Sequence, residues 1–193
     1  MPYLQQLART AKTRASMIHR LSYSMPPHLL ATLANGLLMG KILTACPVTI
    51  PVRLNKTDRS FVTVTEDINK AIKATARTIT KTKLSMKIRS EDVLRKANLR
   101  CLNEAVASIT ALTVWKSHKT MDPLGQLLFQ QWKSERCLRS QFSKEIQIPV
   151  RGYPTLASNI MARVWNSVPE LEHASSVSVA RELSRKWAKT IPR

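Results

Sequence analysis

Apolar side chains recur three and four residues apart through most of this chain, which is the spacing of one face of an α-helix. Prolines and short polar stretches divide the pattern, which predicts helices over about 3–23, 28–44, 63–82, 90–97, 101–119, 124–132, 155–167 and 177–190. Only residues 48–54 alternate apolar and polar side chains, and Pro47 and Pro51 limit them to a short edge strand. The sequence therefore predicts a mainly α fold, an irregular multi-helix bundle of about six to eight helices with at most a short two-stranded element.

The helical pattern fails over residues 133–152, which are polar, basic and weakly periodic. A stretch of this kind between helical segments is typical of a loop or linker. The sequence therefore predicts three parts: a helical domain over 1–132, a basic linker over 133–152 and a C-terminal helical pair over 153–193.

The charge of the chain is one-sided. Its 31 lysine and arginine residues face 12 acidic residues, which gives a formal net charge of +19, and no acid precedes Asp58. A domain with so much like charge repels itself, so a polyanionic partner such as nucleic acid is expected. The most apolar stretch, residues 29–46, is interrupted by Lys41 and is expected to be a buried helix, with no membrane partner.

Four cations fall in one narrow sector of the helix expected over 63–82, at about 100° per residue: Lys70, Lys73, Arg77 and Lys81. The opposite side of that helix is apolar and includes Ile68, Ile72 and Ile79. A row of cations beside a core-facing stripe suits successive phosphates of a nucleic-acid backbone. A solvated lysine face, which many helices have, is the alternative interpretation.

The first expected helix adds three candidate phosphate contacts, Arg9, Lys12 and Arg14. Its apolar residues, among them Leu4, Leu7 and Ile18, fit one face of a core helix with a basic outer side. Residues 1–25 also fit the amphipathic, acid-free helix of a mitochondrial presequence. The sequence leaves these two interpretations open.

Several local patterns predict details of the helices. Thr63 and Glu66 have the spacing of a capping box, and Ser90 is expected to be the N-cap of the short helix that follows. Gly36-x-x-x-Gly40 would allow a neighbouring helix to approach closely. The expected apolar face of the helix over 101–119 consists of Leu102, Val106, Ile109 and Leu112.

Catalytic and metal-binding patterns are missing from the sequence. It has no glycine-rich phosphate loop, no Gly-x-Ser-x-Gly elbow and no His-Glu-x-x-His segment. Cys46, Cys101 and Cys137 are far apart, and the four histidines are equally scattered. We therefore expect no catalytic residues, no metal and no cofactor.

Six blocks, taken in their order along the chain, carry a family resemblance: Ala11-Lys12-Thr13-Arg14-Ala15 with Ile18; Leu29 to Lys41; Ile68-Asn69-Lys70-Ala71 through Thr82; Val93-Leu94, Ala97-Asn98-Leu99 and Leu102-Asn103; Val114-Trp115-Lys116; and Val164-Trp165-Asn166-Ser167-Val168-Pro169. Together they resemble the region downstream of the polymerase core in the reverse transcriptases of non-LTR retrotransposons, the jockey-like elements. The last block is the strongest, and its local chemistry is that of a helix stop: Trp165 is an apolar anchor, and Pro169 prevents continuation.

The resemblance implies a thumb-like region that contacts the backbone of a template and primer, as RNA, DNA or hybrid. It also implies the missing palm and fingers of a parent polymerase as a second partner. The Tyr-x-Asp-Asp palm motif is absent, because Tyr3, Tyr23 and Tyr153 are not followed by paired aspartates. The expectation is a non-catalytic, nucleic-acid-binding remnant of an RNA-directed DNA polymerase, intracellular and nuclear or cytoplasmic rather than mitochondrial.

A basic structural RNA-binding protein of the ribosomal or mitochondrial type would share the charge and the leader-like first helix. A palm-encoding sequence directly upstream of Met1, in multiple dispersed copies, would favour the retroelement, and a single-copy gene would favour the alternative. The sequence leaves open whether the chain is a truncated gene, a pseudogene product or a domesticated protein, and whether it prefers RNA or DNA.

Overall fold

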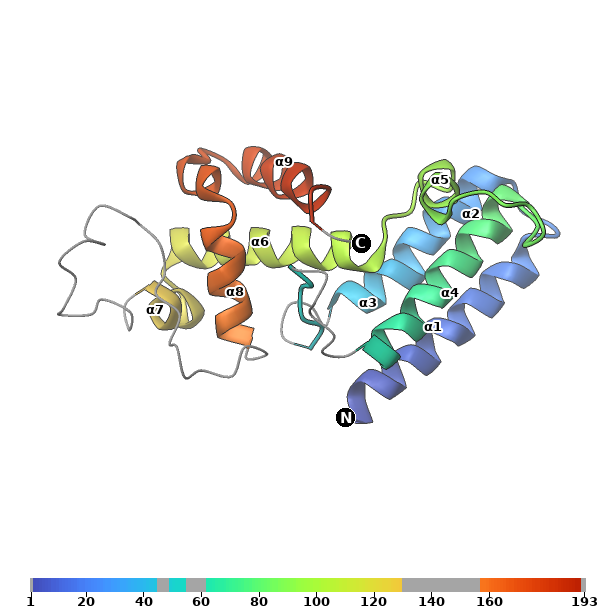
Figure 1. Ribbon diagram of the computed structural model, residues 1–193, viewed down its shortest axis with the longest axis horizontal. Coiled ribbons are helices and arrows are strands. Elements are labelled where there is room, and N and C mark those ends of the chain that lie inside the picture. The colour runs from blue at the N-terminus through green and yellow to red at the C-terminus, as the bar shows by residue number, and fades with distance from the viewer. Residues whose placement is uncertain (1, 45–48, 55–61, 130–156, 192–193) are drawn as a thin grey trace. The chain divides into compact units, whose positions relative to one another are not determined.

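The computed structural model describes residues 2–44, 49–54, 62–129 and 157–191. They form the α-helices α1 (Pro2–Leu21), α2 (Pro27–Leu33), α3 (Gly40–Thr44), α4 (Val62–Thr80), α5 (Ser90–Lys96), α6 (Leu102–Thr120), α7 (Pro123–Phe129), α8 (Ala157–Asn166) and α9 (Val177–Ala188), with a π-helical segment η1 (Ala34–Met39) and a 3-10 helix η3 (Pro169–His173) (Figure 1). The predicted mainly α fold is confirmed. Within these described ranges there is no strand, and residues 49–54 of the expected edge strand are irregular.

The chain divides into two compact units. Unit 1 comprises Met1–Ala45 and Arg59–Ala105, and unit 2 comprises Cys46–Asp58 and Val106–Arg193. This division falls inside α6, whereas the sequence predicted a boundary at a linker over 133–152. That linker lies outside the described residues, so its existence stays a prediction.

Unit 1 is built on the pairing of α1 with α4, which lie side by side (Figure 1). The core side of α4 is the predicted one, because Ile68, Ile72 and Ile79 are buried. Leu7 and Ile18 are buried on α1, so the first helix uses its apolar face as a core helix does. The run α2–η1–α3 packs against α1 and α4, and α5 packs against α4.

The run from Pro27 to Thr44 is continuous, as expected, but it contains the π-helical segment η1. The predicted close approach at Gly36-x-x-x-Gly40 is wrong. A Cβ added at Gly36 would meet no atom within 4 Å, and one at Gly40 would meet only the Asn35 carbonyl oxygen at 3.6 Å. The wider π turn rotates side chains away from the positions that α-helical spacing predicts.

The start of α5 also differs from its prediction. Ser90 is the first residue of the helix, and Arg89 is the N-cap, because its carbonyl oxygen accepts the amides of Asp92 at 3.1 Å and Val93 at 3.3 Å. The residue types of this turn do not show at which residue the helix begins. The Thr63 side chain, the cap expected for α4, lies outside the described residues.

In unit 2, α6 is buried over more than half of its circumference between Val106 and Ser117. Of the four residues expected to form its apolar face, Leu102 and Val106 are buried, but Ile109 and Leu112 are only half-buried. Small residues replace them in the core: Ala107, Ser108, Thr110 and Ala111. The helix stop near the C-terminus is confirmed, since α8 ends at Asn166 and Pro169 opens η3.

The turn from α6 to α7 has no room for a side chain at Gly125. A Cβ there would lie 2.1 Å from the Ser117 carbonyl oxygen, which already accepts the Met121 amide at 2.9 Å. The Gly125 amide donates to the Asp122 carboxylate at 2.8 Å, so the first turn of α7 is held in place. Only glycine allows the two backbones to approach this closely.

Gly125→Ala is therefore expected to lower the free energy of unfolding by about 1–3 kcal/mol, because backbone must move to admit the methyl group. Urea denaturation would show a lower midpoint at an unchanged slope. Gly36→Ala is the matched control, and it should leave stability unchanged or raise it by ~0.5–1 kcal/mol, as alanine does in open helical positions. Equal stability of the two variants would contradict the close contact at Gly125.

Candidate nucleic-acid interface

The cationic row predicted on α4 lies on its outer side. Lys70 and Lys73 are exposed and Arg77 is half-buried, on the side of the helix opposite the buried isoleucines. Their spacing of three and four residues brings the three side chains onto one face. This face is available to a partner of unit 1.

The row begins beside two acidic residues near the start of α4, Glu66 and Asp67. Glu66 Oε1 lies 3.2 Å from Lys70 Nζ, and Asp67 Oδ2 lies 3.1 Å from Lys12 Nζ. Glu66 stands four residues before Lys70, a spacing that places opposite charges together on a helix and could have revealed the pair. Both ion pairs are exposed, so each contributes little to stability, about 0–1 kcal/mol, and a phosphate can compete for either lysine.

The three cations of α1 do not form one surface. Lys12 reaches α4 through Asp67, whereas an Arg14 guanidinium nitrogen donates to the carbonyl oxygen of Leu37 in η1. Two residues apart on a helix, Lys12 and Arg14 project from different flanks. Arg9 is exposed. The predicted site on α1 is thus divided, because Lys12 lies beside the α4 row and Arg14 is turned toward η1.

The C-terminal end of the row has no acidic neighbours in the sequence, because residues 68–90 contain no acid. Lys73, Arg77 and Lys81 form no ion pair with any carboxylate in the described part of the chain. The segment after α4 adds exposed cations: Lys83, Lys87 and Arg89. The uncompensated charge of unit 1 therefore gathers at the C-terminal end of α4.

Lys81 does not belong to the helical sector in which the sequence placed it. The helix ends at Thr80, and Lys81 has a φ of 52°, in the left-handed region. The Thr82 amide donates a hydrogen bond to the Arg77 carbonyl oxygen at 3.0 Å, and the Lys81 amide donates to the Thr78 carbonyl oxygen at 3.3 Å. This pair of hydrogen bonds is a Schellman motif. The part of the row on the helix therefore ends at Arg77, and Lys81 lies beyond the last helical residue.

The short helix α5 ends in the same way. Asn98 has a φ of 54°, and the amides of Leu99 and Asn98 bond the carbonyl oxygens of Leu94 at 2.9 Å and Arg95 at 3.1 Å. The motif reverses the chain at Asn98 and satisfies carbonyl groups that a helix end would otherwise leave without partners.

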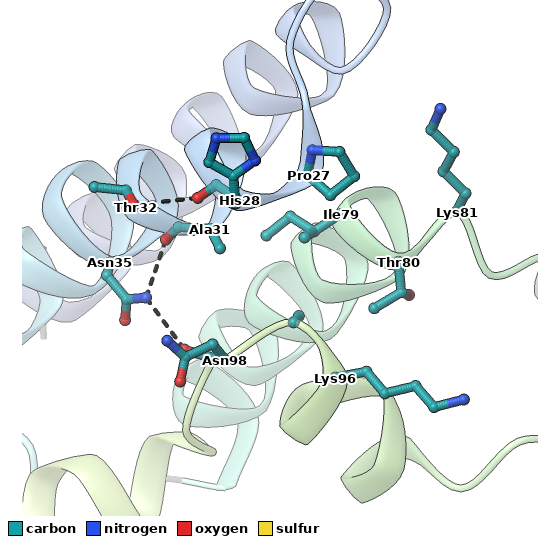
Figure 2. A pocket seen from close by; sticks show the side chains of 11 residues that line it. Pro27, His28, Ala31, Thr32, Asn35, Ile79, Thr80, Lys81, Lys96 and Asn98 are labelled. Carbon is teal, nitrogen blue, oxygen red and sulfur yellow. Dashed lines mark hydrogen bonds between the residues drawn. The ribbon is translucent and has the colours of Figure 1, made fainter.

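The ends of α4 and α5 and the first turns of α2 surround a pocket of about 730 Å³ within unit 1 (Figure 2). Its lining is cationic, polar and apolar but contains no carboxylate: Pro27, His28, Ala31, Thr32, Asn35, Ile79, Thr80, Lys81, Lys96, Ala97 and Asn98. Figure 2 shows Lys81 and Lys96 extending outward on one side with Thr80 between them, and Asn35 and Asn98 on the opposite side. The pocket could not be predicted from the sequence, because its residues come from three separate segments.

The wall opposite the lysines is held by one side-chain amide. Asn35 Nδ2 donates to the carbonyl oxygens of Ala31 at 3.0 Å and Asn98 at 3.1 Å. Both partners are acceptors, so the nitrogen of the amide must face them. This joins the run of α2 and η1 to the end of α5 and keeps the pocket open between them.

Within the described ranges, no three histidine, cysteine, aspartate or glutamate residues gather as a metal site would require. Among the described helices, none has both the length and the apolarity needed to cross a membrane.

Comparisons of this chain with protein-family models, with curated proteins and with solved structures found no match.

Proposed function

We propose that this chain binds the phosphate backbone of nucleic acid, as a non-catalytic, thumb-like remnant of a retrotransposon reverse transcriptase. The observation that carries the binding proposal is the exposed row on α4, whose Lys73 and Arg77, with Lys81 beyond the helix end, lack any carboxylate partner among the described residues. The polymerase ancestry is supported by the order of the sequence blocks alone.

Backbone contact is the chemistry that such a surface supports best. Lysine and arginine contact phosphates without reading bases, and their binding releases condensed counterions. Successive cations of the row rise by about 4.5 to 6 Å along α4, a step that neighbouring phosphates of one strand can follow. The acid-free segment 68–90 continues this charge beyond the helix.

Replacing Lys73, Arg77 and Lys81 together by glutamine is expected to weaken binding to single-stranded oligonucleotides. The plot of log affinity against log salt concentration should become shallower by about two units, since each lost phosphate contact on a single strand removes about 0.7. Fluorescence anisotropy at several salt concentrations measures this slope. An unchanged slope would overturn the proposal.

The matched control removes three exposed cations with the same spacing from unit 2: Arg181, Arg185 and Lys189. Lys186 stays in place because its Nζ lies 2.9 Å from Glu182 Oε1. In this control, the slope of log affinity against log salt concentration should change little. An equal change in both triple variants would mean that net charge, and not the α4 row, governs binding.

Primer extension by the purified chain should yield no product, and a product would contradict the non-catalytic assignment.

A further inference from the structure

We propose that the pocket between α2 and the ends of α4 and α5 binds one nucleoside monophosphate unit of a nucleic-acid strand, with the phosphate at Lys81 and Lys96. This inference rests on the proposed function, because Lys81 belongs both to the cations at the end of α4 and to the pocket lining. A strand that follows the row on α4 therefore arrives at the side of the pocket where the lysines lie.

The charge of the lining favours a phosphate over other ligands. Lys81 and Lys96 extend from two different helix ends on the same side of the pocket (Figure 2). Neither forms an ion pair with a described carboxylate, and the lining contains no acid that would repel an anion. Lys81 and Lys96 point in different directions in Figure 2, but both are exposed and attached to the rim of the same pocket. Either ammonium group can donate a charge-assisted hydrogen bond to a phosphate at the mouth of the pocket.

The rest of the lining suits a sugar and base. Ile79 points toward Ala31 and His28 in Figure 2, so aliphatic groups and an imidazole ring line the part of the pocket away from the lysines. A base has two flat faces, which aliphatic groups and aromatic rings cover without regard to its identity. A pocket of about 730 Å³ falls in the range that small-molecule ligands occupy, whereas a bare phosphate would leave most of it empty.

Three polar side chains of the lining, Thr32, Asn35 and Thr80, are already engaged within the protein. The Thr32 hydroxyl donates to the His28 carbonyl at 3.1 Å, and the Thr80 and Thr82 hydroxyl oxygens lie 2.7 Å apart. Asn35 Nδ2 is occupied by two carbonyl oxygens. We therefore expect binding that depends on the phosphate and on the presence of a base, with weak preference among bases.

The test is a titration of the isotope-labelled full chain with adenosine 5′-monophosphate, adenosine and inorganic phosphate, followed through backbone amide resonances. The monophosphate should shift the amides of Thr80, Ala97 and Asn98 in a saturable way. Adenosine and phosphate should each bind at least about tenfold more weakly, since each supplies only part of the contacts. Equal affinity for phosphate and the monophosphate would overturn the assignment to a nucleotide.

Two variants separate the pocket from general attraction to a basic protein. Lys96→Gln should weaken monophosphate binding about tenfold by removing one charge-assisted contact, whereas Lys41→Gln, at an exposed position of α3, should not. Ala31→Leu fills the pocket at constant charge and should also abolish the shifts, while Ala74→Leu on the exposed side of α4 should leave them intact. Unchanged binding in both pocket variants would overturn the proposal.

The same variants distinguish this inference from the proposed function. A short oligoadenylate carrying a terminal phosphate should lose affinity in Lys96→Gln, because Lys96 lies in the pocket and outside the row. If the oligonucleotide binds with the expected salt slope but its affinity is unchanged in Lys96→Gln and Ala31→Leu, the binding role of the α4 row is supported and the pocket assignment fails. If no oligonucleotide binds in a salt-dependent way, the proposed function itself fails.

Discussion

Replacing Trp165 by alanine is expected to lower the free energy of unfolding by ~3–5 kcal/mol, the range for removal of a buried tryptophan. Trp165 is 5% exposed on α8, and its ring centroid lies 4.8 Å from that of His118 on α6 and 5.1 Å from that of Phe129 on α7. One side chain thus joins three helices of unit 2. Urea denaturation followed by circular dichroism would measure the loss as a lower midpoint.

Trp187→Ala provides the control. Trp187 is only half-buried on α9, so its replacement should lower the free energy of unfolding clearly less. Trp165→Phe should retain part of the stability, because a smaller ring still fills part of the cluster. A Trp165→Ala variant as stable as Trp187→Ala would show that the cluster of Trp165, His118 and Phe129 does not form in solution.

Ile72→Ala is expected to lower the free energy of unfolding by ~2–5 kcal/mol, because it removes buried methyl groups and leaves a cavity between α4 and its neighbours. Ile72 is 0% exposed, on the side of α4 that faces the core of unit 1. Thermal or urea unfolding measures the effect. The variant should keep the salt slope of oligonucleotide binding under conditions in which it remains folded, because the outer row is intact.

The adjacent residue supplies the control for this prediction. Lys73→Ala changes the exposed side of the same helix turn, so stability should stay within about 0.5 kcal/mol of the original while the salt slope falls. The two neighbours are thus expected to affect different measurements. A large loss of stability in Lys73→Ala, or a small one in Ile72→Ala, would contradict the orientation of α4.

The two faces of α4 could be predicted because both depend on local spacing. A helix places residues three and four apart on one side, so Ile68, Ile72 and Ile79 had to share a face opposite Lys70 and Lys73. The same reasoning located the end of α8, where a proline two residues after Ser167 cannot continue the helix. Local chemistry was sufficient wherever one element alone decided the outcome.

The candidate site was predictable only in part, because charge on a helix face does not reveal its partners in other elements. Asp67 binds Lys12 from a position 55 residues away, and Arg14 turns to a carbonyl of η1. Lys81 lies outside the helical row because the backbone adopts a left-handed conformation at this residue. Lysine seldom adopts that conformation, so the amino-acid composition does not predict it.

The sequence alone determined that the chain is helical, that α4 has a core side and a cationic side, and that its positive charge is concentrated where acids are missing. These properties follow from residue type and helical period. Only the tertiary structure decided that Lys12 and Arg14 are engaged by neighbouring elements and that Lys81, Lys96 and His28 line one pocket. Helix packing and two chain reversals bring these residues together, and both depend on contacts between segments that no local pattern encodes.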